Sequence, residues 1–102
     1  MKTHNKLVRD LIPAIIQRSG KTAVTRRLDE PDYIAALHRK LDEEAAELHE
    51  SGSLEEMADV LEVLLALCEA AGHTREELES VRAAKAEERG GFRQRIFLEE
   101  VR

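Results

Sequence analysis

Two helical patterns meet at a glycine in the stretch LDEEAAELHESGSLEEMADV, residues 41–60. Apolar residues recur at helical spacing before Gly52 and again after it. Gly52 is a typical helix stop, and Ser53 has the side chain of a helix N-cap. We therefore expect one helix to end near Glu50 and another to begin at Leu54, with the two folded into an antiparallel hairpin.

Four acidic residues, Glu44, Glu47, Glu56 and Asp59, lie at mirrored distances from the turn of this hairpin. At about 1.5 Å rise per residue, antiparallel packing sets Glu47 level with Glu56 and Glu44 level with Asp59. The spacing predicts that the four carboxylates converge on one place near the turn.

Helical geometry separates these acids from their neighbours. Glu44 lies about 50° and Glu47 about 110° from the centre of the apolar stripe of their helix, whereas Glu43 points nearly opposite, toward solvent. On the following helix, Glu56 falls inside the apolar arc and Asp59 lies at its margin. The stripe on the first helix consists of Ile34, Leu37, Leu41 and Leu48.

Converging carboxylates repel one another strongly in a low dielectric unless a cation lies between them. Oxygen ligands without Cys or His favour a hard divalent ion. We therefore expect Mg²⁺, with Mn²⁺ as the other candidate, bound by all four acids. Two simpler roles compete with this prediction. Glu56 stands three residues after Ser53 and fits a capping box, and the dipole of the helix N-terminus favours an acid such as Asp59.

The rest of the chain also reads as mainly α. We expect a turn up to Ile12, a helix from Pro13 to Gly20, a helix from about Pro31 to Glu50, and a third over roughly 54–71. The capping box Thr74–Glu77 opens a fourth helix, which ends near Arg89. Residues 22–28 and 93–99 are expected to pair as a small two-stranded β ribbon, because a lone strand leaves backbone groups unsatisfied. The predicted fold is an antiparallel bundle of about four helices with this ribbon.

Composition limits the class of protein. The chain has 102 residues, 36% of them charged and 3% aromatic, and a net charge of −5. This length fits a single domain over residues 1–102. The acidic balance argues against a nucleic-acid polymer as partner, and no apolar run approaches the length of a membrane span. With no apolar signal segment and a solitary Cys68, we expect a cytoplasmic protein without a membrane partner.

Glu43-Glu44-Ala-Ala-Glu47 followed by Glu56-Met-Ala-Asp59 resembles the EExxE and ExxD elements of the MazG-like, all-α nucleoside triphosphate pyrophosphohydrolases. Three further segments resemble a short, single-domain "house-cleaning" branch of that superfamily. They are Asn5-Lys-Leu-Val-Arg-Asp10, Asp59-Val-Leu-Glu-Val-Leu64 and Lys85-Ala-Glu-Glu-Arg-Gly-Gly-Phe92. The likeness covers essentially the whole chain, although residues 48–55 between the acidic motifs form a shorter connection than in many members.

The resemblance implies a reaction and a set of residues. A nucleoside triphosphate would be hydrolysed to nucleoside monophosphate and pyrophosphate, with Glu44, Glu47, Glu56 and Asp59 as magnesium ligands and catalytic acids. Lys6, Arg9, Lys85 and Arg89 would clamp the phosphates. The simpler interpretation of these four cations is that they cover apolar surface and pair with the many glutamates. Glu43 would be at most an outer helper, and Tyr33 would contact a base or belong to the core.

Two other functions stay open on the sequence alone. One is a phosphoribosyl-ATP pyrophosphohydrolase, which uses a related acidic helical scaffold. The other is a non-catalytic dimerisation or partner-binding module, in which the acids form interfacial salt bridges with Arg82, Lys85 or Arg89. The apolar arc of the third helix is wider than one short helix covers. It predicts a homodimer or higher homo-oligomer that buries Val60, Val63 and Leu67 between subunits.

Overall fold

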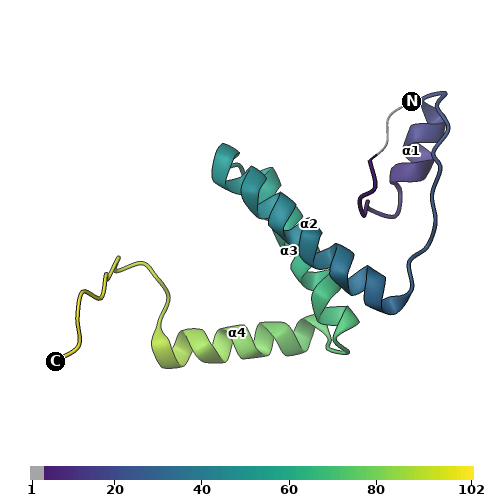
Figure 1. Ribbon diagram of the computed structural model, residues 1–102. Coiled ribbons are helices and arrows are strands. Elements are labelled where there is room, and N and C mark those ends of the chain that lie inside the picture. Colours follow the sequence, from purple (N-terminus) through teal and green to yellow (C-terminus); the bar gives the residue numbers. More distant parts are fainter. Residues whose placement is uncertain (1–3) are drawn as a thin grey trace.

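The computed structural model describes residues 4–102, in which four helices are joined by irregular segments. They are α1 (Ile12–Arg18), α2 (Glu30–Ser51), α3 (Leu54–Ala70) and α4 (Arg75–Arg89). Figure 1 shows α2 and α3 lying along each other, α1 beside this hairpin, and α4 leading away from it. The mainly helical fold is confirmed, and the ends of α2, α3 and α4 agree with the expected ones to within a residue or so.

Local hydrogen bonds place the hairpin turn where the sequence predicted it. Gly52 has φ +62°, a left-handed conformation that glycine adopts without strain, and its N–H donates to the Leu48 carbonyl at 2.7 Å. The Ser53 hydroxyl then accepts a hydrogen bond from the Glu56 N–H at 3.2 Å. Only two residues separate α2 from α3, so the helices must return antiparallel.

The core of the single chain is small. Among the apolar residues of the described part of the chain, only Ala36, Leu37 and Val63 are buried, and they lie where α2 faces α3. The prediction that Val63 is buried between subunits is therefore wrong, because it is already covered within one chain. The surface left free on α3 lies elsewhere on the helix.

The expected β ribbon is not seen, and residues 4–102 contain no strand. Residues 22–28 form an irregular connection from α1 to α2, whereas α4 carries residues 93–99 away from it (Figure 1). A turn also interrupts the second predicted strand, since Arg95 has φ +58° and its N–H donates to the Phe92 carbonyl at 3.1 Å. Residues 22–28 do not form a strand despite their β-branched composition, because residues 93–99, their expected partner, lie too far away to pair with them.

None of the helices in the described part of the chain is long and apolar enough to cross a membrane.

Candidate metal centre and adjoining cavity

The structure brings three of the four predicted acids together. Glu44 on α2 and Glu56 and Asp59 on α3 each offer a carboxylate oxygen, and these oxygens all lie within 4.8 Å of one another. Glu44 is buried, with 7% of its surface exposed, whereas Glu56 and Asp59 are half-buried. The mirrored spacing about Gly52 therefore predicted this convergence correctly for Glu44, Glu56 and Asp59.

The cluster is electrostatically unsatisfied as it stands. Glu44 Oε2 and Glu56 Oε2 are buried and have no hydrogen-bond partner. Desolvation raises the pKa of Glu56 from 4.5 to about 7, helped by its close contact with Glu44 and by repulsion from Glu47, Glu44 and Asp59. Two orphaned buried carboxylate oxygens side by side are what a bound cation would satisfy, so these residues fit a divalent metal.

The side chain of Glu56 does not serve as a helix cap. The Ser53 N–H, which a capping box would pair with Glu56, donates instead to the Ser51 hydroxyl at 3.2 Å. The contrast with α4 is direct, because there the Thr74 N–H donates to Glu77 Oε1 at 3.1 Å and the box is complete. Glu56 is therefore left free to join the acidic cluster.

Glu47 and Glu43 differ from their expected places. Glu47 is exposed and lies outside the group of three, although its charge contributes to the raised pKa of Glu56. Glu43 does not point freely to solvent, since its oxygens lie 3.7 Å from Lys6 Nζ and 3.5 Å from Lys40 Nζ. The prediction that Glu43 points toward solvent is wrong, because Lys6 of the N-terminal segment lies beside it on that face of α2.

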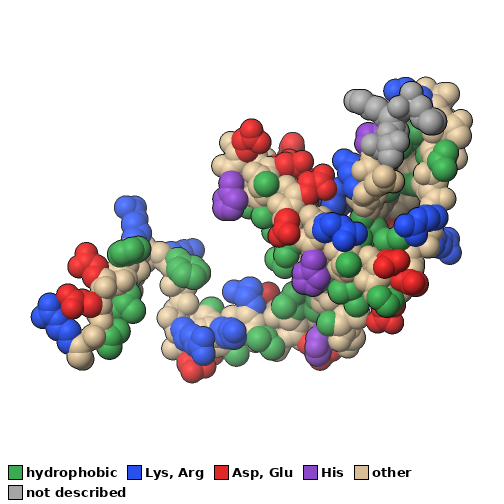
Figure 2. Space-filling model, viewed as in Figure 1, with side chains coloured by type: hydrophobic (Ala, Val, Ile, Leu, Met, Phe, Trp, Pro, Cys, Tyr) green, Lys and Arg blue, Asp and Glu red, His purple; other side chains and the backbone are tan. Residues whose placement is uncertain are grey.

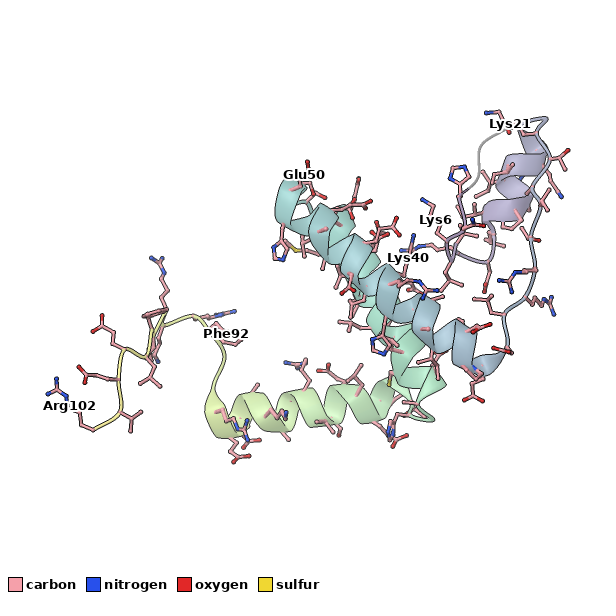
Figure 3. The ribbon with its side chains drawn as sticks, in the orientation of Figure 1. Lys6, Lys21, Lys40, Glu50, Phe92 and Arg102 are labelled. Atoms are coloured by element: carbon pink, nitrogen blue, oxygen red, sulfur yellow. The ribbon has the colours of Figure 1, made fainter. Side chains whose placement is uncertain are left out.

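Two cations contact the acidic cluster, and a third lies beside Glu43. Arg9 Nη2 donates to Asp59 Oδ1 at 2.6 Å, and Lys40 Nζ lies 3.4 Å from Glu44 Oε1. Lys6 and Lys40 both approach Glu43, and Figure 3 shows them where the N-terminal segment meets α2. Of the four predicted phosphate-binding residues, Arg9 is thus at the cluster, whereas Lys6 contacts Glu43 outside it and does not line the adjoining cavity. Lys40 was not predicted to be a site residue. It lies four residues before Glu44 on the same helical face, a spacing at which oppositely charged side chains pair.

A cavity of about 560 Å³ adjoins the cluster. Arg9, Lys40, Glu44 and Asp59 line one part of it, and Tyr33 and Leu37 of α2 line another. Residues 7–12 and Ile15 of the N-terminal segment and Val63 and Ala66 of α3 add apolar surface, and the lining also includes the charged residues Asp10, Glu62, Glu69 and Arg75. This volume falls within the roughly 300–1,000 Å³ range of small-molecule sites, and mixed charged and apolar walls suit a ligand with both kinds of surface.

Lys85 and Arg89 are not brought to this site within one chain. Both lie on α4, which leads away from the hairpin, and neither lines the cavity (Figure 1). Both are exposed, and neither forms an ion pair with another described residue. Arg82 on the same helix pairs with Glu79 rather than with the acidic cluster, its Nε donating to Glu79 Oε2 at 2.8 Å.

Comparisons with known proteins give one relative and no family. The chain is 58% identical over 43 residues to an uncharacterized protein of Mycolicibacterium smegmatis. The match covers 42% of this chain and 44% of that protein, so the chain spans less than half of its relative. No family model and no solved structure matches the chain.

Proposed function

We propose that this protein is a divalent-metal-dependent nucleotide pyrophosphohydrolase that converts nucleoside triphosphates, non-standard ones included, to nucleoside monophosphate and pyrophosphate. The observation that carries the proposal is the cluster of Glu44, Glu56 and Asp59, with its two orphaned buried oxygens, beside a cavity of about 560 Å³ that Glu44 and Asp59 line. The motif resemblance supports the same reaction.

The metal would be held by Glu44, Glu56 and Asp59, and the exposed Glu47 would add negative charge nearby. An oxygen-only ligand set favours Mg²⁺ or Mn²⁺ over zinc. Such an ion, when bound, neutralises phosphate charge and makes a bound water a better nucleophile at neutral pH. A carboxylate of the cluster is then placed to accept the proton of that water.

Charged and apolar groups lining the cavity would bind different parts of a nucleotide. Arg9 is suited to a phosphate oxygen because its guanidinium presents paired N–H donors, and Lys40 adds a second positive charge. The apolar wall and Tyr33 are suited to a sugar and base. Asp10, Glu62, Glu69 and Arg75 also line the cavity and are able to hydrogen-bond polar groups of the sugar or base.

Release of pyrophosphate tests this function. The purified protein would be offered a panel of standard and damaged nucleoside triphosphates, and phosphoribosyl-ATP, each with Mg²⁺. Glu56→Gln should lose at least about 100-fold in kcat while keeping its helical circular dichroism, whereas the matched control Glu55→Gln on the exposed side of α3 should keep activity. Turnover of phosphoribosyl-ATP alone would point to that rival enzyme. No turnover of any nucleotide would refute the proposal.

A further inference from the structure

We propose that this chain acts as a homodimer in which each C-terminal arm lies on the hairpin of the partner copy. The C-terminal arm is α4 together with residues 90–102. The surface that it would cover is the exposed α3 stripe, which consists of Leu54, Met57, Leu61 and Leu64.

The exposed α3 stripe is a continuous apolar surface. Its members follow one another at spacings of three, four and three residues, so they project within about 80° of each other around the helix. Between 41% and 81% of each residue is exposed. Val63, which faces α2, lies on a different side of the helix, so the hairpin's own packing cannot cover this stripe.

The C-terminal arm has apolar side chains with nothing to cover them. Phe92 is 97% exposed and Phe97 86%, and Ile96, Leu98 and Val101 are nearly as open. On α4, Val81 is 56% exposed. Figure 2 shows these hydrophobic side chains standing out along the arm, and Figure 3 places Phe92 far from Lys40 and the acidic site.

The joint between α3 and α4 directs the arm away from its own hairpin (Figure 1). Gly72 takes φ +86°, and the His73 N–H donates to the Cys68 carbonyl at 3.0 Å. Cys68 Sγ donates to the Thr74 carbonyl at 3.3 Å, and Thr74 then begins the complete capping box of α4. Hydrogen bonds on both sides of this four-residue turn hold α4 pointing outward, so the apolar side chains of the arm are open to contact with another molecule.

The surface area is of the right size for a second copy. The chain exposes 9514 Å², whereas a folded monomer of its mass exposes roughly 5,800 Å². Its radius of gyration is 17.9 Å, against about 13 Å for a compact domain of this length. Permanent homodimer interfaces bury roughly 2,000–5,000 Å² in total, or about 1,000–2,500 Å² per chain, so the excess of roughly 3,700 Å² per chain is more than enough to supply such an interface.

Charge also favours the partner's hairpin as the occupant. Residues 30–62 contain eleven acidic and two basic residues, whereas residues 82–102 contain six basic and four acidic residues. The whole arm, residues 75–102, carries seven basic and seven acidic residues, so it is the part of the arm from residue 82 onward that is opposite in sign to the hairpin. Since each copy has one arm and one stripe, a two-fold dimer satisfies both surfaces at once.

Sedimentation equilibrium at about 10 μM tests the dimer, with an expected mass twice the chain mass of 11.5 kDa. Leu61→Lys should weaken dimerisation at least tenfold. The control Val24→Lys, which changes an equally apolar residue that is 95% exposed on the connection between α1 and α2, should not. A monomer at this concentration, or unchanged dimerisation of Leu61→Lys, would overturn the proposal.

Exchange of the arms is tested on the unmodified sequence, so it does not depend on a variant folding. A mixture of ¹⁵N-labelled and unlabelled protein would be cross-linked between lysines and carboxylates and analysed by mass spectrometry. Cross-links between Lys85 and the acids of the hairpin should join labelled to unlabelled chains. If they join residues of one chain only, the arms are not exchanged. These readouts are independent of catalysis, so loss of the proposed enzymatic function would leave them unchanged.

Discussion

Arg9 Nη2 donates to Asp59 Oδ1 at 2.6 Å and so ties the N-terminal segment to α3 across fifty residues of sequence. The contact places a positive charge beside the acidic cluster, where it partly balances three converging carboxylates. It also forms part of the wall of the cavity. The Arg9–Asp59 ion pair therefore does two things: it holds the N-terminal segment against α3, which forms the cavity, and it reduces the net negative charge of the candidate metal centre.

Replacing Arg9 should therefore have a small effect on folding and a larger one on nucleotide binding. Both side chains are partly exposed, so Arg9→Met should cost less than about 1 kcal/mol in the free energy of unfolding measured with urea. The Michaelis constant for a triphosphate should rise at least about tenfold if the guanidinium also contacts phosphate. Arg26→Met, on the exposed connection before α2, is the control and should change neither quantity.

Neutralising Glu56 should stabilise the metal-free protein and remove its response to metal. Glu56→Gln takes away a half-buried charge with an orphaned oxygen, so its melting temperature without metal should exceed that of the wild type. Mg²⁺ should raise the melting temperature of the wild type and of Glu55→Gln but leave Glu56→Gln almost unchanged. If Mg²⁺ shifts none of the three, the cluster does not bind this ion.

Replacing Asp59 gives a direct measure of the candidate ligands. Asp59→Asn keeps the shape of the side chain but removes its charge, so the dissociation constant for Mn²⁺ should increase at least about tenfold by titration calorimetry. Asp42→Asn is the matched control, because Asp42 is exposed on α2 and belongs neither to the group of three nor to the lining of the cavity. Equal losses in the two variants would mean that the metal responds only to overall negative charge.

The raised pKa of Glu56 predicts a pH dependence of the metal-free protein. Because the folded protein holds this proton up to about pH 7 and the unfolded chain releases it near 4.5, the folded state binds more protons between those values. Its contribution to stability is full below pH 4.5 and is lost as the pH rises through 7. Urea unfolding in EDTA should show stability falling from pH 5 to pH 8, and Glu56→Gln should lack this part of the decrease.

Glu77 and Glu79 do not obscure that measurement. The backbone N–H of Thr74 lowers the pKa of Glu77, and Arg82 lowers that of Glu79. Their stabilising contributions are present above about pH 4.5 and are lost only as the pH falls further. A profile that is flat from pH 5 to pH 8 would contradict the assignment to Glu56.

The capping box at the start of α4 predicts a local effect. Thr74→Ala removes the hydroxyl that accepts from the Glu77 N–H at 3.1 Å and should cost about 1 kcal/mol. Amide exchange in the first turn of α4 should speed up accordingly. Ser80→Ala, in the exposed middle of the same helix, should have little effect or stabilise slightly.

The sequence by itself determined the features that depend on near neighbours. The turn at Gly52 and Ser53 follows from a left-handed glycine and a capping hydroxyl, and the box from Thr74 to Glu77 from reciprocal bonds three residues apart. The convergence of Glu44, Glu56 and Asp59 was predictable for the same reason. Once two helices are joined by two residues, their spacing along the chain fixes which residues face each other.

Only the tertiary structure decided the features that depend on distant segments. The pairing of Arg9 with Asp59, the covering of Glu43 by Lys6, and the cavity between the N-terminal segment and the hairpin join residues that no helical period relates. The direction of α4 likewise separated residues 22–28 from 93–99 and removed the expected ribbon. Periodicity describes one helix at a time, whereas the path of the chain between helices is set by side chains that meet only after folding.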